Sequence, residues 1–191
     1  MPEIAPLQPG HAYHIYNRGN NRENLFVEAR NYAYFLDLYI RHVEPVAQLF
    51  AYCLMKNHFH LLVRIENSDQ PVREPSRCFS NMFNAYARSF NRAYERTGAL
   101  FQRPFRRIEV TSERHFTALI VYIHRNPQKH GFVKDFRDWP YSSYHSLSST
   151  RSTRLPRDVV TAWFGGVEAL VAAHRREPLA DDIIEDDDDD E

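Results

Sequence analysis

The sequence contains little cysteine and no long apolar segment, and both absences narrow the class of protein. Cys53 and Cys78 are the only cysteines among 191 residues, and no Cys-x-x-Cys pair occurs. This argues against a disulfide framework or a cysteine zinc site and is typical of a reducing cytoplasm. No apolar run is long enough to cross a membrane, so we expect no membrane association. Residues 1–9 lack a basic segment followed by an apolar one, and we therefore expect no signal peptide.

The net charge of the whole chain is the sum of a basic segment and a short acidic C-terminal one. The formal net charge is −1, yet the last eleven residues hold nine acids and no base, so the preceding residues carry +8. Such a surplus is typical of proteins that bind a polyanion such as nucleic acid, although a moderately basic domain needs no such partner. We expect segment 181–191 to be disordered. The alternative is that it occupies a basic groove in place of DNA, in which case its deletion would raise DNA affinity at low salt.

Hydrophobic periodicity predicts the elements of one α+β domain. Strands, marked by alternating apolar residues, are expected at 11–16, 46–55, 58–65 and 105–111. Helices, marked by apolar residues three or four apart, are expected at 28–42, 76–96 and 112–126, and short ones at 157–164 and 167–176. The order strand, helix, strand, strand, helix, strand predicts a ferredoxin-like sandwich, a four-stranded antiparallel sheet with helices on one face. The helix over 112–126 is an extra element.

Local signals predict where these helices begin and end. Ser76 and Ser112 are the expected N-caps of the second and third helices. Pro127 is expected to stop the third helix, because the residue before a proline avoids the helical conformation. The chain beyond it is expected to be irregular, with surface-packed loops at 139–143 and 146–154.

Two histidines form the one candidate metal site. His58 and His60 lie on the predicted strand 58–65, where alternate residues point to the same face, so their imidazoles can converge. Neutral imidazole is the commonest protein ligand for divalent metals. With ten histidines in the chain, the same spacing also arises by chance on a half-exposed strand. A chemical partner elsewhere in the sequence has to decide between these interpretations.

Tyr122 and Asn126 are the candidate partners, because residues four apart share one face of a helix. A tyrosine phenolate can attack a phosphodiester and form a covalent phosphotyrosine. A divalent metal would polarise the phosphate, with Asn126 adding an oxygen ligand to the two imidazoles. The absence of sulfur ligands favours Mg²⁺ or Mn²⁺. The chain has eleven tyrosines, and a helical tyrosine usually packs in a core, so spacing alone leaves Tyr122 one candidate among several.

Five segments, taken in order, resemble a known family. They are residues 13–19, 54–62, 98–105, 122–127 and 139–143. Together they resemble the single-tyrosine HUH transposase superfamily, specifically the REP-associated tyrosine transposases. The resemblance covers roughly Ala12 to His145 and implies a ferredoxin-like catalytic domain. We expect this domain to span 1–145, followed by a C-terminal extension with short helices over 146–180 and the acidic tail 181–191. Lys56 stands where family members commonly have proline, a departure that leaves both histidines in place.

The resemblance also implies an activity and a set of site residues. It implies a metal-dependent endonuclease and strand transferase that acts on single-stranded, hairpin-forming DNA, such as REP elements, through a 5′-phosphotyrosine intermediate. His58, His60 and Asn126 match the metal ligands, with Mg²⁺ or Mn²⁺ as cofactor, and Tyr122 matches the nucleophile. The expected protein is cytoplasmic, associated with the nucleoid through its substrate, and works as a monomer or a homodimer.

Basic side chains near these segments are the candidate DNA contacts. Single-stranded DNA is held by basic grooves and aromatic platforms. The candidates are Arg18, Arg22, Arg103, Arg107, Arg125 and Lys129. The same side chains are also explained as solvated charges beside core aromatics such as Phe101 and Phe105.

Two other functions stay open from the sequence. One is a domesticated, non-cleaving binder of structured single-stranded DNA or RNA, a role that ferredoxin-like sheets often serve. The other is hydrolysis by metal-activated water without a covalent step. The presence of His58, His60 and Tyr122 together favours the strand transferase over the binder.

Overall fold

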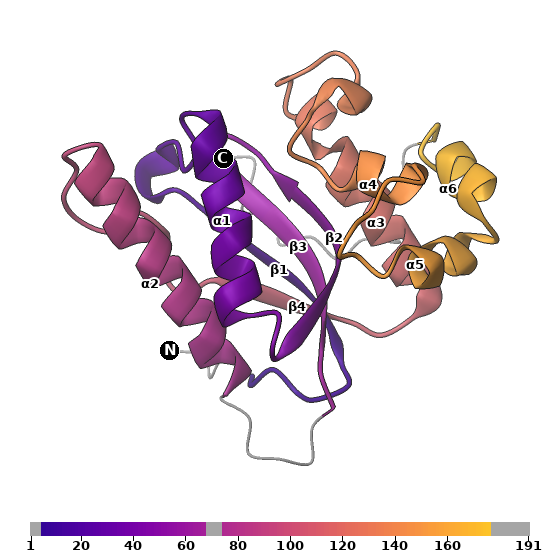
Figure 1. Ribbon diagram of the computed structural model, residues 1–191, viewed down its shortest axis with the longest axis horizontal. Coiled ribbons are helices and arrows are strands. Elements are labelled where there is room, and N and C mark those ends of the chain that lie inside the picture. The colour runs from indigo at the N-terminus through magenta and orange to yellow at the C-terminus, as the bar shows by residue number, and fades with distance from the viewer. Residues whose placement is uncertain (1–4, 68–73, 177–191) are drawn as a thin grey trace.

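The computed structural model describes residues 5–67 and 74–176, which form a four-stranded antiparallel sheet between two layers of helices (Figure 1). The strands are β1 (Ala12–Arg18), β2 (Ala47–Leu54), β3 (His58–Ile65) and β4 (Arg106–Val110). Their order across the sheet is β2-β3-β1-β4, with every neighbouring pair antiparallel. This order confirms the predicted ferredoxin-like sandwich.

Two helices, α1 (Ala29–His42) and α2 (Pro75–Ala93), cover one face of the sheet (Figure 1). Phe59 of β3 lies between Phe35 of α1 and Phe83 of α2, with ring centroids 4.9 and 5.4 Å away. Burying an aromatic side chain of this size stabilises the fold by about 1.5–3 kcal/mol. This face is therefore an aromatic core that holds the strands in place.

The start of α2 corrects one prediction. Its N-cap is Glu74 and not Ser76, because the Glu74 carboxylate accepts the backbone N–H groups of Ser76 and Arg77 at 2.9 and 2.8 Å. Pro75 occupies the first helical turn, where its missing N–H would have no partner in any case. A carboxylate there also interacts favourably with the helix dipole.

The helix α3 (Glu113–Lys129) packs on the opposite face, against β2 and β3. It begins as predicted after its N-cap, Ser112. The predicted stop at Pro127 is wrong, because the helix continues through the proline. A proline so near the end removes a single backbone hydrogen bond, and the His130 N–H still donates to the Asn126 carbonyl at 2.9 Å.

Short helical segments after α3 cover its outer side (Figure 1). They are a 3₁₀ turn at Phe136–Asp138, α4 (Tyr144–Ser148), α5 (Arg157–Phe164) and α6 (Val167–Ala173). The short helices expected near 157–164 and 167–176 are confirmed. Residues 181–191, expected to be disordered, lie outside the described residues.

Segment 139–143 corrects the expectation of a surface loop. The Trp139 indole N–H donates to the Leu54 carbonyl at 2.9 Å, and Ser143 is fully buried. Both residues tie the segment to the end of β2, because their polar atoms find partners on that strand. Within 5–67 and 74–176, no helix is long and apolar enough to cross a membrane.

Candidate active site

His58 and His60 project from β3 toward α3, while Phe59 between them points into the aromatic core. The two imidazole centroids lie 5.3 Å apart. His60 is 2% exposed, so it sits inside the layer between the sheet and α3. The two-residue period of a strand is what places both rings on this face.

A third histidine, His14 of β1, completes what we call the histidine cluster: His14, His58 and His60. The His14 Nε2 lies 2.9 Å from the His60 Nδ1, and the two rings stack. Tyr16, two residues further along β1, stacks on His60 with centroids 5.7 Å apart. Sequence reasoning missed His14 and Tyr16, although their alternation in β1 puts them on one face. Only the β1–β3 register shows that this face is the one that His60 occupies.

The hydrogen bonds leave one nitrogen of each metal-ligand candidate available. The His58 Nδ1 donates to the Asn57 side-chain oxygen at 2.8 Å, which leaves the lone pair on Nε2. In His60, the Nε2 is buried and has no hydrogen-bond partner among the described residues. If the His60 Nδ1–H donates to His14, the His60 Nε2 likewise carries a lone pair. An outer partner that fixes the ring orientation in this way is typical of metal-binding histidines.

Tyr122 and Asn126 meet this cluster from α3. The Tyr122 ring centroid lies 5.7 Å from that of His60, and His130, at the end of α3, lies 4.8 Å from His58. Asn126 lies on the same face of α3, four residues after Tyr122 and four residues before His130. Its Oδ1 is buried without a partner among the described residues, while its amide N–H donates to the Tyr122 carbonyl at 3.2 Å.

This donor set fits a divalent metal ion. Two imidazole nitrogens and the Asn126 oxygen form a mixed nitrogen and oxygen set that leaves positions for water and phosphate oxygen. The buried, unpartnered His60 Nε2 and Asn126 Oδ1 are the observation behind this fit, because buried polar atoms normally have partners. Within the described part of the chain, no three His, Cys, Asp or Glu side chains form a metal-binding group.

Burial keeps the histidines neutral, which is the form that binds a metal. It lowers the pKa of His14 to about 3, helped by the charge of His115. It lowers the pKa of His58 to about 3 as well, with smaller contributions from His130 and Arg18. The pKa of His60 is also held well below its usual value, first by burial and then by the neighbouring histidines.

Three of the six predicted DNA-contacting residues lie near the end of β1 or beside the tyrosine. Arg18, the last residue of β1, pairs with His58. The Lys129 ammonium lies 5.3 Å from the centroid of the Tyr122 ring. Arg22 is exposed in the turn that follows β1. Arg18 and Lys129 thus bring positive charge to the histidine cluster and the tyrosine.

The other three lie elsewhere. Arg125 faces away from the sheet, where its guanidinium donates to the His174 carbonyl at 2.8 Å and covers the Phe136 ring. Arg103 and Arg107 line a cavity beside α2, on the opposite face of the sheet from the histidine cluster. The structure does not bring these three residues to the histidines, and their contact with DNA stays a prediction.

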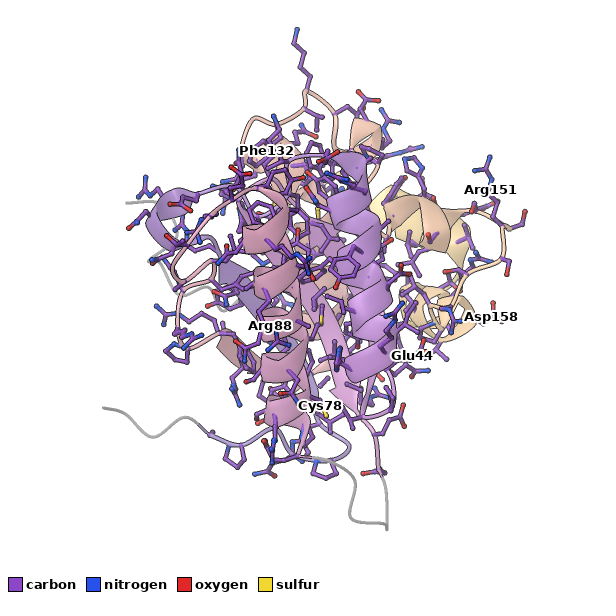
Figure 2. The ribbon with its side chains drawn as sticks, turned by 60° about the vertical axis from the view of Figure 1, so that its left-hand side comes forward. Glu44, Cys78, Arg88, Phe132, Arg151 and Asp158 are labelled. Carbon is purple, nitrogen blue, oxygen red and sulfur yellow. The ribbon has the colours of Figure 1, made fainter. Side chains whose placement is uncertain are left out.

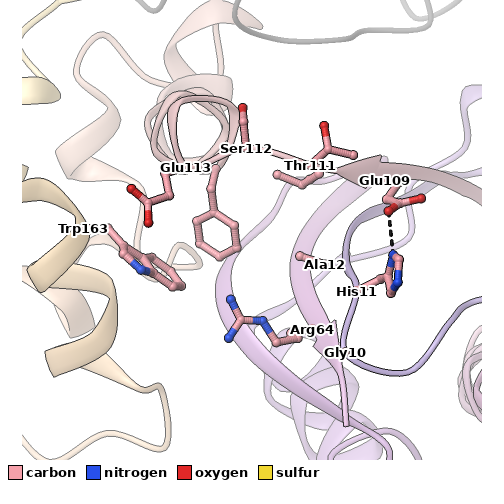
Figure 3. Close-up of a pocket in the computed structure, with 11 residues that line it drawn as sticks. Gly10, His11, Ala12, Arg64, Glu109, Thr111, Ser112, Glu113 and Trp163 are labelled. Atoms are coloured by element: carbon pink, nitrogen blue, oxygen red, sulfur yellow. Dashed lines mark hydrogen bonds and ion pairs between the residues drawn. The ribbon is translucent and has the colours of Figure 1, made fainter. Parts of the chain in front are cut away.

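A separate cavity of about 390 Å³ lies near the start of β1 and of α3 (Figure 3). The His11 Nδ1 and a Glu109 carboxylate oxygen, both in its lining, are hydrogen-bonded at 2.6 Å. Arg64 extends toward Trp163, with its guanidinium 5.7 Å from the ring centroid. Glu113 adds a second carboxylate to the lining (Figure 3). Two carboxylates disfavour a bound phosphate, so this cavity is not part of the candidate site.

Known proteins are similar to this chain in sequence. The model of the family described as IS200-like transposases matches residues 8–126. A Haemophilus influenzae protein, named provisionally as a REP-associated tyrosine transposase, is 30% identical over 101 residues, which cover 50% of this chain and 57% of that protein. The REP-associated tyrosine transposase of Escherichia coli is 25% identical over 95 residues, covering 50% of this chain and 53% of that protein. The chain thus spans about half the length of these curated relatives.

A solved structure has the same fold. It is described as a REP-associated tyrosine transposase bound to a REP hairpin, and it matches with a TM-score of 0.57 at 22% sequence identity. The match covers 76% of this chain and 83% of the other. At this identity the likeness establishes the fold alone.

Proposed function

Because this chain belongs to the family of IS200-like transposases, we propose that it is a metal-dependent endonuclease and strand transferase. Its proposed substrate is single-stranded DNA that forms a REP-like hairpin, and its intermediate is a 5′-phosphotyrosine at Tyr122. The observation that carries the proposal is the contact of the Tyr122 ring with His60, whose buried Nε2 has no partner among the described residues. A nucleophile thus lies beside the candidate metal ligands.

The proposed reaction is a transfer of the phosphate from one oxygen to another. The Tyr122 oxygen forms a bond to phosphorus, the bond from phosphorus to the 3′ oxygen breaks, and the phenol proton ends on the released 3′ hydroxyl. The Lys129 ammonium beside the ring stabilises the negative charge that develops on the tyrosine. A bound Mg²⁺ or Mn²⁺ would polarise the scissile phosphate. His58, His60 and Asn126 would hold that ion.

One chain supplies every proposed site residue. Tyr122 of α3 and His60 of β3 contact each other within the same molecule. This supports a site that is complete in a monomer, with the nucleophile acting in cis. We propose that residues 1–145 form the catalytic domain and that 146–180 form an extension.

The proposed substrate rests on two supports. The first is the family, together with a structural relative whose description names a bound REP hairpin. The second is charge, because the chain without its last eleven residues carries +8. Phosphate contacts from such a surface supply much of the affinity for nucleic acid.

The deciding experiment is cleavage of labelled hairpin DNA with flanking single strands, in Mg²⁺ or Mn²⁺, followed by a denaturing gel. A protein–DNA adduct is expected for the wild type and is expected to be lost in Tyr122→Phe. Tyr34→Phe is the matched control, since Tyr34 is on α1, across the sheet from the histidine cluster, and bonds only to Ser89 among the described residues. Cleavage by Tyr122→Phe at the wild-type rate would instead indicate metal-activated water. Binding without any cleavage by the wild type would indicate the non-cleaving binder.

A further inference from the structure

A second cavity lies on the other face of the sheet, between α2 and segment 98–105, and we call it the α2 cavity. Its volume is about 720 Å³, within the range of pockets that hold small ligands. The lining includes three arginines, Arg88, Arg103 and Arg107, and no carboxylate. In this it differs from the cavity of Figure 3, which has two carboxylates. An anionic group is therefore favoured in the α2 cavity.

One wall is a polar stripe along α2. Ser80, Asn84 and Arg88 are spaced by four residues and line the cavity from one helix face. Arg88 lies in the C-terminal half of the helix (Figure 2). Asn84 and Arg88 are both exposed, and within the described residues the Asn84 carboxamide makes no hydrogen bond. A carboxamide offers a donor and an acceptor side by side, which is the pattern that reads the edge of a base.

The opposite wall is held rigidly by the end of β1. The Gln102 N–H donates to the Arg18 carbonyl at 3.0 Å, and the Asn17 side-chain amide donates to the Gln102 carbonyl at 3.1 Å. Arg107 stacks on the Phe105 ring with its guanidinium 4.2 Å from the centroid. Its Nε is buried and has no hydrogen-bond partner among the described residues. The guanidinium also donates to the Ser76 hydroxyl at 2.8 Å, so Arg107 is a fixed positive charge at this wall.

The α2 cavity and the histidine cluster adjoin the same end of β1. Asn17 lines the cavity, and its neighbour Arg18 pairs with His58. Because successive strand residues point to opposite faces, the two sites lie on the two sides of one strand end. A flexible single strand that leaves the histidine cluster can therefore pass around this end of the sheet to the α2 cavity.

We propose that the α2 cavity holds one unstacked nucleotide of the single-stranded segment beside the hairpin. Asn84 reads the edge of its base, while Arg88 and Arg103 contact phosphate. This inference rests on the proposed function, because it names a second contact for the same DNA substrate. It also assigns Arg103 a role away from the metal site.

The test measures the affinity of the full chain for two labelled DNAs by fluorescence anisotropy. One DNA is a hairpin with single-stranded flanks, and the other is the same hairpin with blunt ends. Asn84→Ala is expected to weaken binding of the flanked DNA about tenfold, in line with the loss of a base-edge contact. Arg88→Ala is expected to lower the slope of log affinity against log salt by about 0.7, as for the loss of one phosphate contact on a single strand. Binding of the blunt hairpin is expected to stay unchanged in both variants.

Asn81→Ala and Arg92→Ala are the matched controls. Both residues are exposed on α2 but do not line the cavity. If Asn84→Ala and Arg88→Ala bind the flanked DNA as these controls do, the nucleotide site is wrong while the proposed function stands on the wild-type binding. If the wild type binds neither DNA, both proposals are overturned. Because all four side chains are exposed, unchanged thermal unfolding is expected to exclude misfolding as the cause.

Discussion

Two buried histidine pairs lie on the two sides of α3, and their rings are arranged alike. His14 and His60 lie toward the sheet, with ring centroids 5.0 Å apart and planes at 23°. His124 and His174 lie toward α6, also with 5.0 Å between centroids and 23° between planes. The direct nitrogen distances are 2.9 and 2.8 Å. Ring geometry therefore does not distinguish the pairs.

The two pairs differ in the hydrogen bonds of the ring nitrogens that point away from the other histidine of the pair. In the α6 pair, the His174 Nδ1 donates to the Leu170 carbonyl at 2.8 Å, so its Nε2 accepts from the His124 Nδ1. The His124 Nε2 then accepts from the Ser143 hydroxyl at 2.7 Å. All four ring nitrogens are used. In the other pair, the His14 Nδ1 and the His60 Nε2 have no partner among the described residues.

The His124–His174 pair is a structural contact, whereas the His14–His60 pair has the features of a binding site. An unsatisfied buried polar atom costs about 1–3 kcal/mol, so the unpartnered His60 Nε2 is explained best by a ligand that occupies it. The satisfied pair joins α3 to α6 and, through Ser143, to β2, whose Tyr52 N–H donates to the same hydroxyl at 2.9 Å. It thereby holds the helix that carries Tyr122.

The largest expected effect comes from His60→Ala. Loss of a proposed metal ligand should reduce cleavage at least about 10³-fold, as for removal of a member of a catalytic group. Calorimetric titration with Mn²⁺ should show no binding to this variant. The partner experiment is His174→Phe, which should keep Mn²⁺ binding because it touches only the satisfied pair. Equal loss of metal binding in both variants would remove the distinction between the pairs.

His14→Phe tests whether the outer histidine orients the inner one. The His60 Nδ1 would lose its partner, and Mn²⁺ affinity should fall about 10- to 100-fold, as for other outer partners of metal ligands. His14→Gln, whose side-chain oxygen can accept the same hydrogen bond, should recover most of the affinity. Equal affinity in the Phe and Gln variants would contradict an orienting role.

His174→Phe should lower the free energy of unfolding by about 2 kcal/mol, because it leaves the buried His124 N–H without its acceptor. Urea unfolding followed by circular dichroism measures this change. Val167→Ala on α6 is the control, since Val167 is exposed and its loss should change little. A His174→Phe protein as stable as the control would mean that the pair does not hold the extension.

Acid should weaken the satisfied pair by a smaller amount. Burial lowers the pKa of His174 to about 4, against 6.5 for an ordinary histidine, with a nearby Arg125 adding to the shift. Between these two pKa values the unfolded chain binds the extra proton, so the free energy of unfolding falls as pH drops below about 6.5. The slope from this residue is at most about 1.4 kcal/mol per pH unit. Unfolding at pH 7 and pH 5 should show a shallower dependence for His174→Phe than for the wild type.

Local patterns predicted much of the site. The bounds of β3 and the shared face of His58 and His60 follow from the two-residue period of a strand. The shared face of Tyr122 and Asn126 follows from helical spacing, and the helix that carries them begins at the predicted Ser112. Each of these features depends only on residues close together in the chain.

Errors arose where a competing local signal was equally plausible. Ser76 is a common N-cap residue, but the Glu74 carboxylate accepts two backbone N–H groups before it. Pro127 usually ends a helix, yet here the loss of one hydrogen bond near the end is tolerated. Arg125 is a different case: it lies within segment 122–127, and the helical turn points it to α6 and away from the histidine cluster, so its contact with DNA stays a prediction.

The sequence by itself determined the order of the elements, the convergence of His58 with His60 and the pairing of Tyr122 with Asn126 on one helix face. These depend on repeat periods of two and 3.6 residues, which are properties of the local chain. Only the tertiary structure decided that His14 reaches His60, since this requires the register between β1 and β3. It alone also separated the two histidine pairs, because whether a buried nitrogen has a partner depends on groups far away in the chain.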